Sequence, residues 1–253
     1  MEQCNLTPAN SLKLSNPLSS DWVYLRPSLI PSLLNVVKEN QNHFPEVKIF
    51  ELANTYLKKK ADLPEENLTL SGLATLDFYN LKGLIESLMI DLGITDYVFV
   101  APEKETPALF RSTQTAQLII NKQTAGFVGE IKAEILSKLE VKPRLAAFEL
   151  KAQILSQAAS GKKIYRSIST YPPVIEDLTF TLPEKTPLGK VIQLIKQADQ
   201  LVHRIDLIDC FENNFTFRIE YQSSQKNLSA EDVTKIRSRI INQTEKNFGA
   251  KLK

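Results

Sequence analysis

The sequence predicts an α+β fold made of two successive domains, each built on an antiparallel sheet. The chain has 253 residues, of which 43% are hydrophobic, enough for two modest cores and outside the range of disordered chains. Strand patterns outnumber helical ones at first, and the last stretch, about ninety residues long, follows the order β-α-β-β-α-β. A small, polar run at residues 156–163 separates the two patterns, so we expect domains at residues 1–155 and 160–253.

The first domain begins with a helix over residues 28–40, because Leu29, Leu33 and Val37 recur there at helical spacing. Gly93 follows the last apolar position of a second helical pattern and is expected to end that helix. Further elements are expected as helices at residues 81–92 and 131–139, and as strands at residues 47–56, 118–120, 127–130 and 146–150. Such a set suits a mostly antiparallel sheet.

The second domain has a clearer pattern. Leu178 and Phe180 alternate with polar residues, which predicts a half-buried strand, and Pro187 is placed to begin a helix. Ser229 and Asp232 resemble a capping box at the start of a second helix, which ends at Gly249. The remaining strands are expected at residues 202–211, 215–221 and 250–253. In this ferredoxin-like order both helices cover one sheet face, so the other face should be exposed.

Composition excludes several classes of protein. No apolar run approaches the roughly 20 residues of a membrane helix, so we expect no membrane association. The two cysteines, Cys4 and Cys210, lie in no motif, which fits a reducing cytoplasm and a cytoplasmic protein. Residues 160–253 hold 15 Lys and Arg against 11 Asp and Glu, a net charge of +4 within a total of +2. This excess is compatible with a phosphate-bearing partner.

The sequence offers no convincing catalytic set. His43 and His203 fall in different predicted domains, and neither has further metal ligands at a suitable spacing. No glycine-rich phosphate loop follows a predicted strand, and neither cysteine sits in a basic context. We therefore expect no catalytic residue, no metal site and no cofactor bound by this chain itself.

Several short runs occur in a familiar order. Leu25-Arg26-Pro27-Ser28-Leu29 leads into the first helix, and the next strand carries Phe50-Glu51. Phe78-Tyr79-Asn80-Leu81-Lys82-Gly83, Gly126-Phe127-Val128-Gly129-Glu130 and Phe148-Glu149-Leu150 follow. This order resembles the C-terminal portion of the bacterial phenylalanyl-tRNA synthetase (phenylalanine–tRNA ligase) beta subunit. In that family the first run is a degenerate class II synthetase dimer-interface motif.

The resemblance implies that the first domain is a catalytically inactive, class II synthetase-like sheet. Active class II enzymes hold ATP with an arginine in a Phe-Arg-x-Glu strand, whereas this chain has Ile49-Phe50-Glu51 with no arginine, and we expect none nearby to replace it. ATP and Mg²⁺ would then belong to the holoenzyme, an alpha-2 beta-2 heterotetramer that joins phenylalanine to tRNA(Phe). The implied task of the first domain is to pack on the alpha subunit, with the helix at residues 28–40 at that interface.

The second domain resembles the family's ferredoxin-fold anticodon-binding domain. The resemblance rests on residues 171–178, 207–211, 228–233 and 248–252. It implies that the exposed sheet face receives the first anticodon base. Alternation places Asp177, Thr179, Asp209, Phe211, Asn214 and Thr216 on that face, and the first five are the predicted anticodon contacts. Phe211 would stack on the base, and a carboxylate would accept hydrogen bonds from a guanine.

Other positions bear on the RNA backbone. Arg166, Arg218 and Lys226 are candidates for phosphate contacts. Glu176 stands where the family has an arginine, so we expect one positive charge fewer near the RNA. The alternatives are a free-standing RNA-binding or scaffold protein that reuses these folds and, more remotely, a small-molecule enzyme of the ferredoxin-like type. A stand-alone RNA binder should be more basic than +2, and an enzyme should show a convergent titratable cluster.

Overall fold

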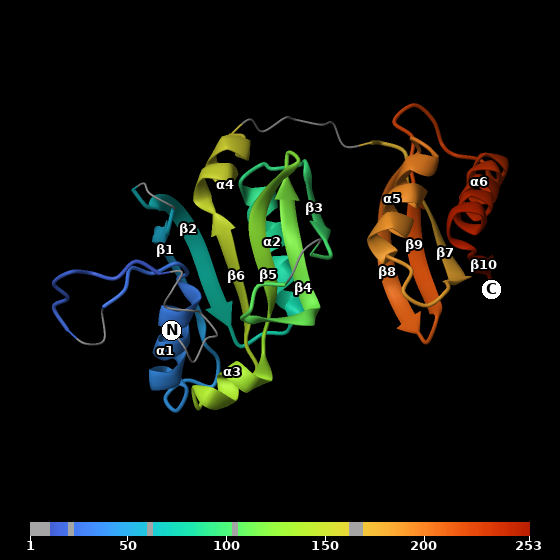
Figure 1. The fold of residues 1–253 in the computed structure, drawn as a ribbon. Helices are drawn as coiled ribbons and strands as arrows, with labels where there is room; N and C mark the ends of the chain where they lie inside the picture. The colour runs from blue at the N-terminus through green and yellow to red at the C-terminus, as the bar shows by residue number, and fades with distance from the viewer. Residues whose placement is uncertain (1–10, 20–22, 60–62, 103–105, 162–168) are drawn as a thin grey trace. The chain divides into compact units, whose positions relative to one another are not determined.

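The protein is described here by a computed structural model of residues 11–19, 23–59, 63–102, 106–161 and 169–253. The chain divides into two compact units, Met1–Ile164 (unit 1) and Tyr165–Lys253 (unit 2). Each unit has its own sheet (Figure 1). The described residues of unit 1 form two hydrophobic clusters, one on each sheet face, and those of unit 2 form one. The α+β class and the antiparallel sheets predicted from the sequence are confirmed.

Within its described residues, unit 1 is a six-stranded sheet in which all neighbours are antiparallel. The spatial order is β1-β2-β6-β5-β4-β3. The strands are β1 (Lys48–Leu57), β2 (Glu65–Ala74), β3 (Tyr97–Val100), β4 (Phe110–Ile120), β5 (Gln123–Ile131) and β6 (Ala146–Lys151). β2 and β3 are the strands that the sequence did not predict, and β2 forms a hairpin with β1.

Helices lie against both faces of this sheet. They are α1 (Ile30–Asn40), α2 (Phe78–Asp91), α3 (Ala133–Lys138) and α4 (Ala152–Ala158). Leu33 and Leu34 of α1 pack with α3 in one core, and Ile85 and Met89 of α2 pack with α4 in the core on the other face. α1 and α2 begin two and three residues from their predicted positions, and Gly93 follows α2 with φ +67°, as expected for a helix end.

α4 was not predicted. The sequence reading places a linker from residue 156, but the helix continues to Ala158, and Leu155 is 5% exposed in the core. The segment after α4 is tied back to unit 1, because the Ser160 N–H donates to the Leu92 carbonyl at 2.9 Å. The small and polar residues 156–158 therefore belong to the packed helix α4, which their composition alone does not predict.

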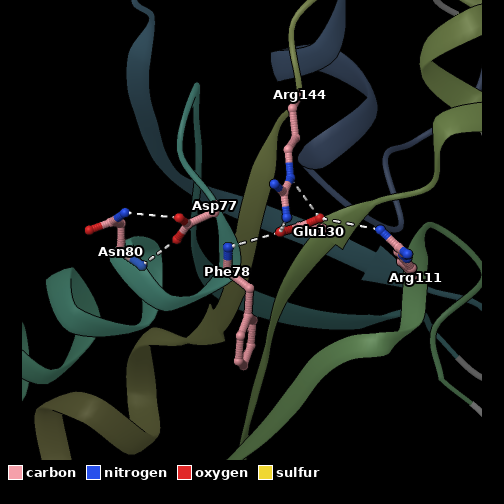
Figure 2. A network of polar contacts seen from close by, with 6 residues as sticks. All are labelled: Asp77, Phe78, Asn80, Arg111, Glu130 and Arg144. Carbon is pink, nitrogen blue, oxygen red and sulfur yellow. Dashed lines mark hydrogen bonds and ion pairs between the residues drawn. The ribbon is translucent and has the colours of Figure 1, made fainter. Parts of the chain in front are cut away.

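A buried carboxylate joins four segments of unit 1 (Figure 2). The Glu130 side chain, at the end of β5, is 3% exposed. Its Oε1 accepts from the N–H of Phe78 at the start of α2, at 3.1 Å, and its Oε2 accepts from Arg144 Nε at 3.0 Å. Arg144 Nη2 also contacts Oε1, and Arg111 Nη1 lies 4.0 Å from Oε2. Glu130 thus connects β5, α2, β4 and the loop before β6.

In its described residues, unit 2 is a four-stranded antiparallel sheet with the spatial order β10-β7-β9-β8. Its elements are β7 (Val174–Thr181), α5 (Leu188–Ala198), β8 (Val202–Phe211), β9 (Asn214–Tyr221), α6 (Ala230–Phe248) and β10 (Lys251–Leu252). Numbered within the unit, the strand order is 4-1-3-2, so the predicted β-α-β-β-α-β arrangement is confirmed.

The two helices of unit 2 define its core. Val191 and Ile195 of α5 and Ile236 and Ile240 of α6 are buried against one sheet face. α6 begins with the predicted capping box, in which the Ser229 side chain and Asp232 exchange hydrogen bonds with each other's backbone N–H groups. The helix ends at Gly249, whose φ of +66° favours glycine. The other sheet face is uncovered by any described helix.

Candidate nucleic-acid interface

The uncovered face of the unit 2 sheet, here called the open face, is identified by strand register. Leu178 and Leu207 both pair with Phe217, which is fully buried under the helices. Paired residues share a sheet face and neighbours along a strand alternate, so the residues next to these three point to the open face. The open face comprises Ile175, Asp177, Thr179 and Thr181 of β7, Asn214, Thr216, Arg218 and Glu220 of β9, Arg204, Asp206, Asp209 and Phe211 of β8, and Lys251 of β10. All five residues predicted to contact an anticodon lie on it.

One end of the open face combines an exposed aromatic ring with polar groups. Phe211 is 67% exposed and lies directly opposite Asn214 across the β8–β9 hairpin. Asn214 Oδ1 accepts from Thr181 Oγ1 at 2.7 Å, which leaves its amide nitrogen as a donor. Asp209 Oδ1 accepts from the Cys210 N–H at 2.9 Å, which leaves Oδ2 as an acceptor. This Phe211 end can therefore stack on a planar ring and exchange hydrogen bonds at the ring's edge.

Cross-strand pairs occupy the middle of the open face. The hydroxyl groups of Thr179 and Thr216 are 2.9 Å apart. Arg218 donates to both oxygens of Asp177, from Nε at 2.8 Å and from Nη2 at 2.7 Å. The hydrogen-bonded guanidinium holds the pKa of the Asp177 carboxyl below its usual range. Arg218 is therefore one half of a neutral pair and not a free cation for a phosphate.

The open face has no excess of positive charge. Its acidic residues are Asp177, Asp206, Asp209 and Glu220, and its basic residues are Arg204, Arg218 and Lys251. Arg204 and Asp206 form an ion pair at 2.8 Å. The residues of the open face therefore do not carry the net charge of +4 counted over residues 160–253. A nucleic acid on this face would be held through its bases more than through its phosphates.

The structure corrects one expectation about charge. Glu176 does not face the open side. Its Oε1 accepts from Arg237 Nη1 of α6 at 2.7 Å, and its Oε2 accepts from the Tyr221 hydroxyl at 3.3 Å. Because Glu176 lies on the helix side of the sheet, an acidic residue at this position does not change the net charge of the open face. The expectation was wrong because it ignored the alternation that places Asp177 outside.

The phosphate candidates lie in different surroundings. Lys226 Nζ contacts Asp232 Oδ2 at 2.8 Å beside the start of α6 and is not part of the open face. Arg166 lies outside the described residues. Sequence reasoning also missed members of the open face. Alternation alone predicts Thr181 and Glu220. It does not predict Arg204 and Asp206, because a register shift between Leu207 and Asp209 interrupts the alternation in β8.

Two family models match this chain, one over most of unit 1 and one over unit 2. The family model described as the phenylalanyl tRNA synthetase beta chain CLM domain matches residues 2–152, more than half of the chain. The chain belongs to this family. A second family model, the ferredoxin-fold anticodon binding domain, matches residues 169–253, which are the described part of unit 2. In this family member, then, the open face belongs to a domain of the anticodon-binding type.

Relatives match nearly the whole chain. It is 29% identical over 266 residues to the phenylalanine–tRNA ligase beta subunit of Carboxydothermus hydrogenoformans and 28% identical over 269 residues to that of Thermotoga maritima. Each match covers 96% of this chain and 33% of the relative. The chain thus spans about a third of the length of these relatives. A pyrrolysyl tRNA synthetase structure from Desulfitobacterium hafniense has a TM-score of 0.46 at 15% identity over 64% of this chain and 59% of its own.

Unit 1 of this family member holds one unexpected arginine. Arg26, in the loop before α1, contacts Glu51 of β1 at 2.9 Å, so the expectation that no guanidinium lies near this strand is wrong. The pairing neutralises Arg26, which lines neither the cavity beside Arg111 and Arg144 nor the cavity beside Glu149. Among the described residues, no group of three or more His, Cys, Asp or Glu is arranged to hold a metal ion. No described helix is long and apolar enough to cross a membrane.

Proposed function

We propose that this chain acts as the C-terminal part of a phenylalanine–tRNA ligase beta subunit and that its open face binds the anticodon end of tRNA(Phe). The observation that carries the proposal is the Phe211 end of the open face, an exposed ring beside an amide donor and a carboxylate acceptor. This combination is what recognition of a single unstacked base needs. The beta subunits named above are parts of a phenylalanine–tRNA ligase.

The first anticodon base would bind as a guanine. Its ring would stack on Phe211, which is worth about 1–3 kcal/mol per base. Asp209 Oδ2 would accept from the base's N–H groups, and Asn214 would donate to an acceptor on the base or ribose. The hydroxyl pair of Thr179 and Thr216 would border the base on its other side. Because the open face has no positive excess, phosphate contacts would come from basic residues at its rim.

The proposed protein partner is the alpha subunit of the ligase, in an alpha-2 beta-2 heterotetramer. The apolar stripe of α1 is buried in the core of unit 1, so it is not available for such a contact. Exposed apolar side chains are found instead on β1 and β2, where Phe50 is 75%, Leu52 is 54% and Leu68 is 47% exposed. These three residues, here called the edge patch, share one face of the sheet beyond the cover of α2.

ATP and Mg²⁺ would serve the holoenzyme through its other subunit. A nucleotide triphosphate needs several cationic groups, and the cavity on the α1 side of unit 1 is lined by Lys151 as its one Lys or Arg. It is also lined by Glu149, which would repel a phosphate. The residues that line this cavity therefore do not fit the nucleotide.

Mixing the chain with the alpha subunit tests the packing role. The pair should co-elute in size-exclusion chromatography, and Leu52→Glu should abolish co-elution, because it places a charge in the centre of the edge patch. Leu84→Glu is the matched control, since Leu84 of α2 is 51% exposed but lies outside the patch. An unaffected complex with Leu52→Glu, or its equal loss with Leu84→Glu, would show that the edge patch is not the contact surface.

A further inference from the structure

A cavity of about 360 Å³ lies on the α1 side of the unit 1 sheet. Its floor is polar where a sheet packed under a helix is usually apolar. Thr55 and Thr69 are each 4% exposed, and their hydroxyl groups are 2.9 Å apart. The apolar wall is formed by Pro27, Ile30, Leu57, Leu109, Phe110 and Phe127. Size and lining are those of a small-molecule site.

Glu149 is the most distinctive group in this cavity. Its Oε2 accepts from the Ser28 hydroxyl at 2.7 Å and from the Leu29 N–H at 3.1 Å, at the start of α1. The Ile30 N–H and the Ser71 hydroxyl also form hydrogen bonds with this carboxylate. Two carboxylate oxygens have about four acceptor sites, so a further donor can still be accepted. Burial raises the pKa of the Glu149 carboxyl in spite of these bonds. A cationic group beside it would lower the free energy of its ionised form.

Lys151 supplies the opposite charge. It follows Glu149 by two residues on β6, so the two side chains lie on the same sheet face with Cα atoms roughly 7 Å apart. Lys151 lines the cavity opposite Thr69 of β2 and is exposed to solvent. Within the described residues its ammonium takes part in no ion pair. The cavity thus presents a carboxylate, an ammonium and an apolar wall within reach of one small ligand.

We propose that this cavity binds a free α-amino acid with an apolar side chain. The ligand's ammonium group would contact Glu149, its carboxylate would contact Lys151, and its side chain would lie against Phe110 and Phe127. The threonine hydroxyls of the floor would complete the hydrogen bonds of the ligand's polar end. This inference is independent of tRNA binding by unit 2, and it involves no reaction.

Titration of the full chain with L-leucine and L-phenylalanine tests the proposal. Calorimetry should show saturable binding, and amide resonances of Thr69, Gly126 and Lys151 should shift. Phenethylamine lacks the carboxylate and 3-phenylpropanoate lacks the ammonium, so each should bind more weakly than L-phenylalanine by roughly tenfold or more. Equal binding of either analogue, or the absence of saturable binding by both amino acids, would overturn the proposal.

Two variants locate the binding. Lys151→Ala should weaken binding by roughly tenfold, and Glu149→Gln by roughly 30-fold. Lys48→Ala is the matched control, because Lys48 is an exposed strand lysine on the other face of the sheet. If Glu149→Gln does not fold, Lys151→Ala and the two analogues still decide the question. Unchanged affinity in Lys151→Ala, or an equal loss in Lys48→Ala, would contradict the assigned site.

Discussion

Replacing Glu130 with alanine should lower the free energy of unfolding of unit 1 by about 2–4 kcal/mol. The substitution removes the acceptor for the Phe78 N–H at the start of α2 and separates Arg144 and Arg111 from the end of β5. Both arginine side chains are 58% exposed and their guanidinium groups can return to water, so the expected loss stays below that of a fully buried ion pair. Urea denaturation measures it, and hydrogen exchange of β5 and β6 amides assigns the loss to unit 1.

Two companion variants separate the causes of that loss. Glu134→Ala, an exposed glutamate on the adjacent α3, should change the free energy of unfolding by less than about 0.5 kcal/mol. Glu130→Gln should fall between the two, because an amide oxygen can still accept from the Phe78 N–H. If Glu130→Ala changes stability no more than Glu134→Ala does, the network in Figure 2 contributes no net stability.

Phe211→Ala should weaken tRNA(Phe) binding by about 5- to 150-fold, which corresponds to the loss of one stacked base. Because the ring is 67% exposed and packs on no other aromatic ring of the described residues, the fold of unit 2 should be unchanged. Affinity is measured by filter binding at one fixed salt concentration, since salt alone changes such constants. Circular dichroism checks the fold.

Ile175→Ala is the matched control for this experiment. Ile175 is 55% exposed on the same open face, but it pairs with Glu220 at the end opposite to Phe211. Its replacement should leave the affinity unchanged. An equal loss of affinity with both variants would indicate a diffuse apolar contact. Unchanged affinity with Phe211→Ala would show that Phe211 does not stack on a base.

The sequence predicted the elements with strong periodicity and missed those whose identity depends on distant contacts. β8 has the predicted bounds of Val202 and Phe211, because the segment is rich in apolar residues and the turn at Asn213-Asn214 follows it. β2 begins with the polar Glu65-Glu66-Asn67 and becomes a strand through pairing with β1 and β6. Its polar start gives no period-2 signal strong enough to be read locally.

Alternation predicted part of the open face. Alternation was sufficient for Asp177 and Thr179, because β7 pairs with β9 without interruption. It failed for Asp206, since the register shift after Leu207 reverses which residues of β8 face outward. The surroundings of Glu149 and Glu130 could not be predicted at all. Their burial depends on segments distant in the chain, and a carboxylate in a strand pattern looks the same whether it is exposed or enclosed.

The central claim is that the open face of unit 2 reads the first anticodon base. The most direct measurement compares binding of the full chain, at one moderate salt concentration, to tRNA(Phe) and to a variant with that base changed from guanine. Losing the hydrogen bonds to Asp209 should weaken binding of the variant by about 1.5–3 kcal/mol, and this difference should disappear in Phe211→Ala/Asp209→Ala. Equal binding of the two RNAs by the unmodified chain would contradict the claim.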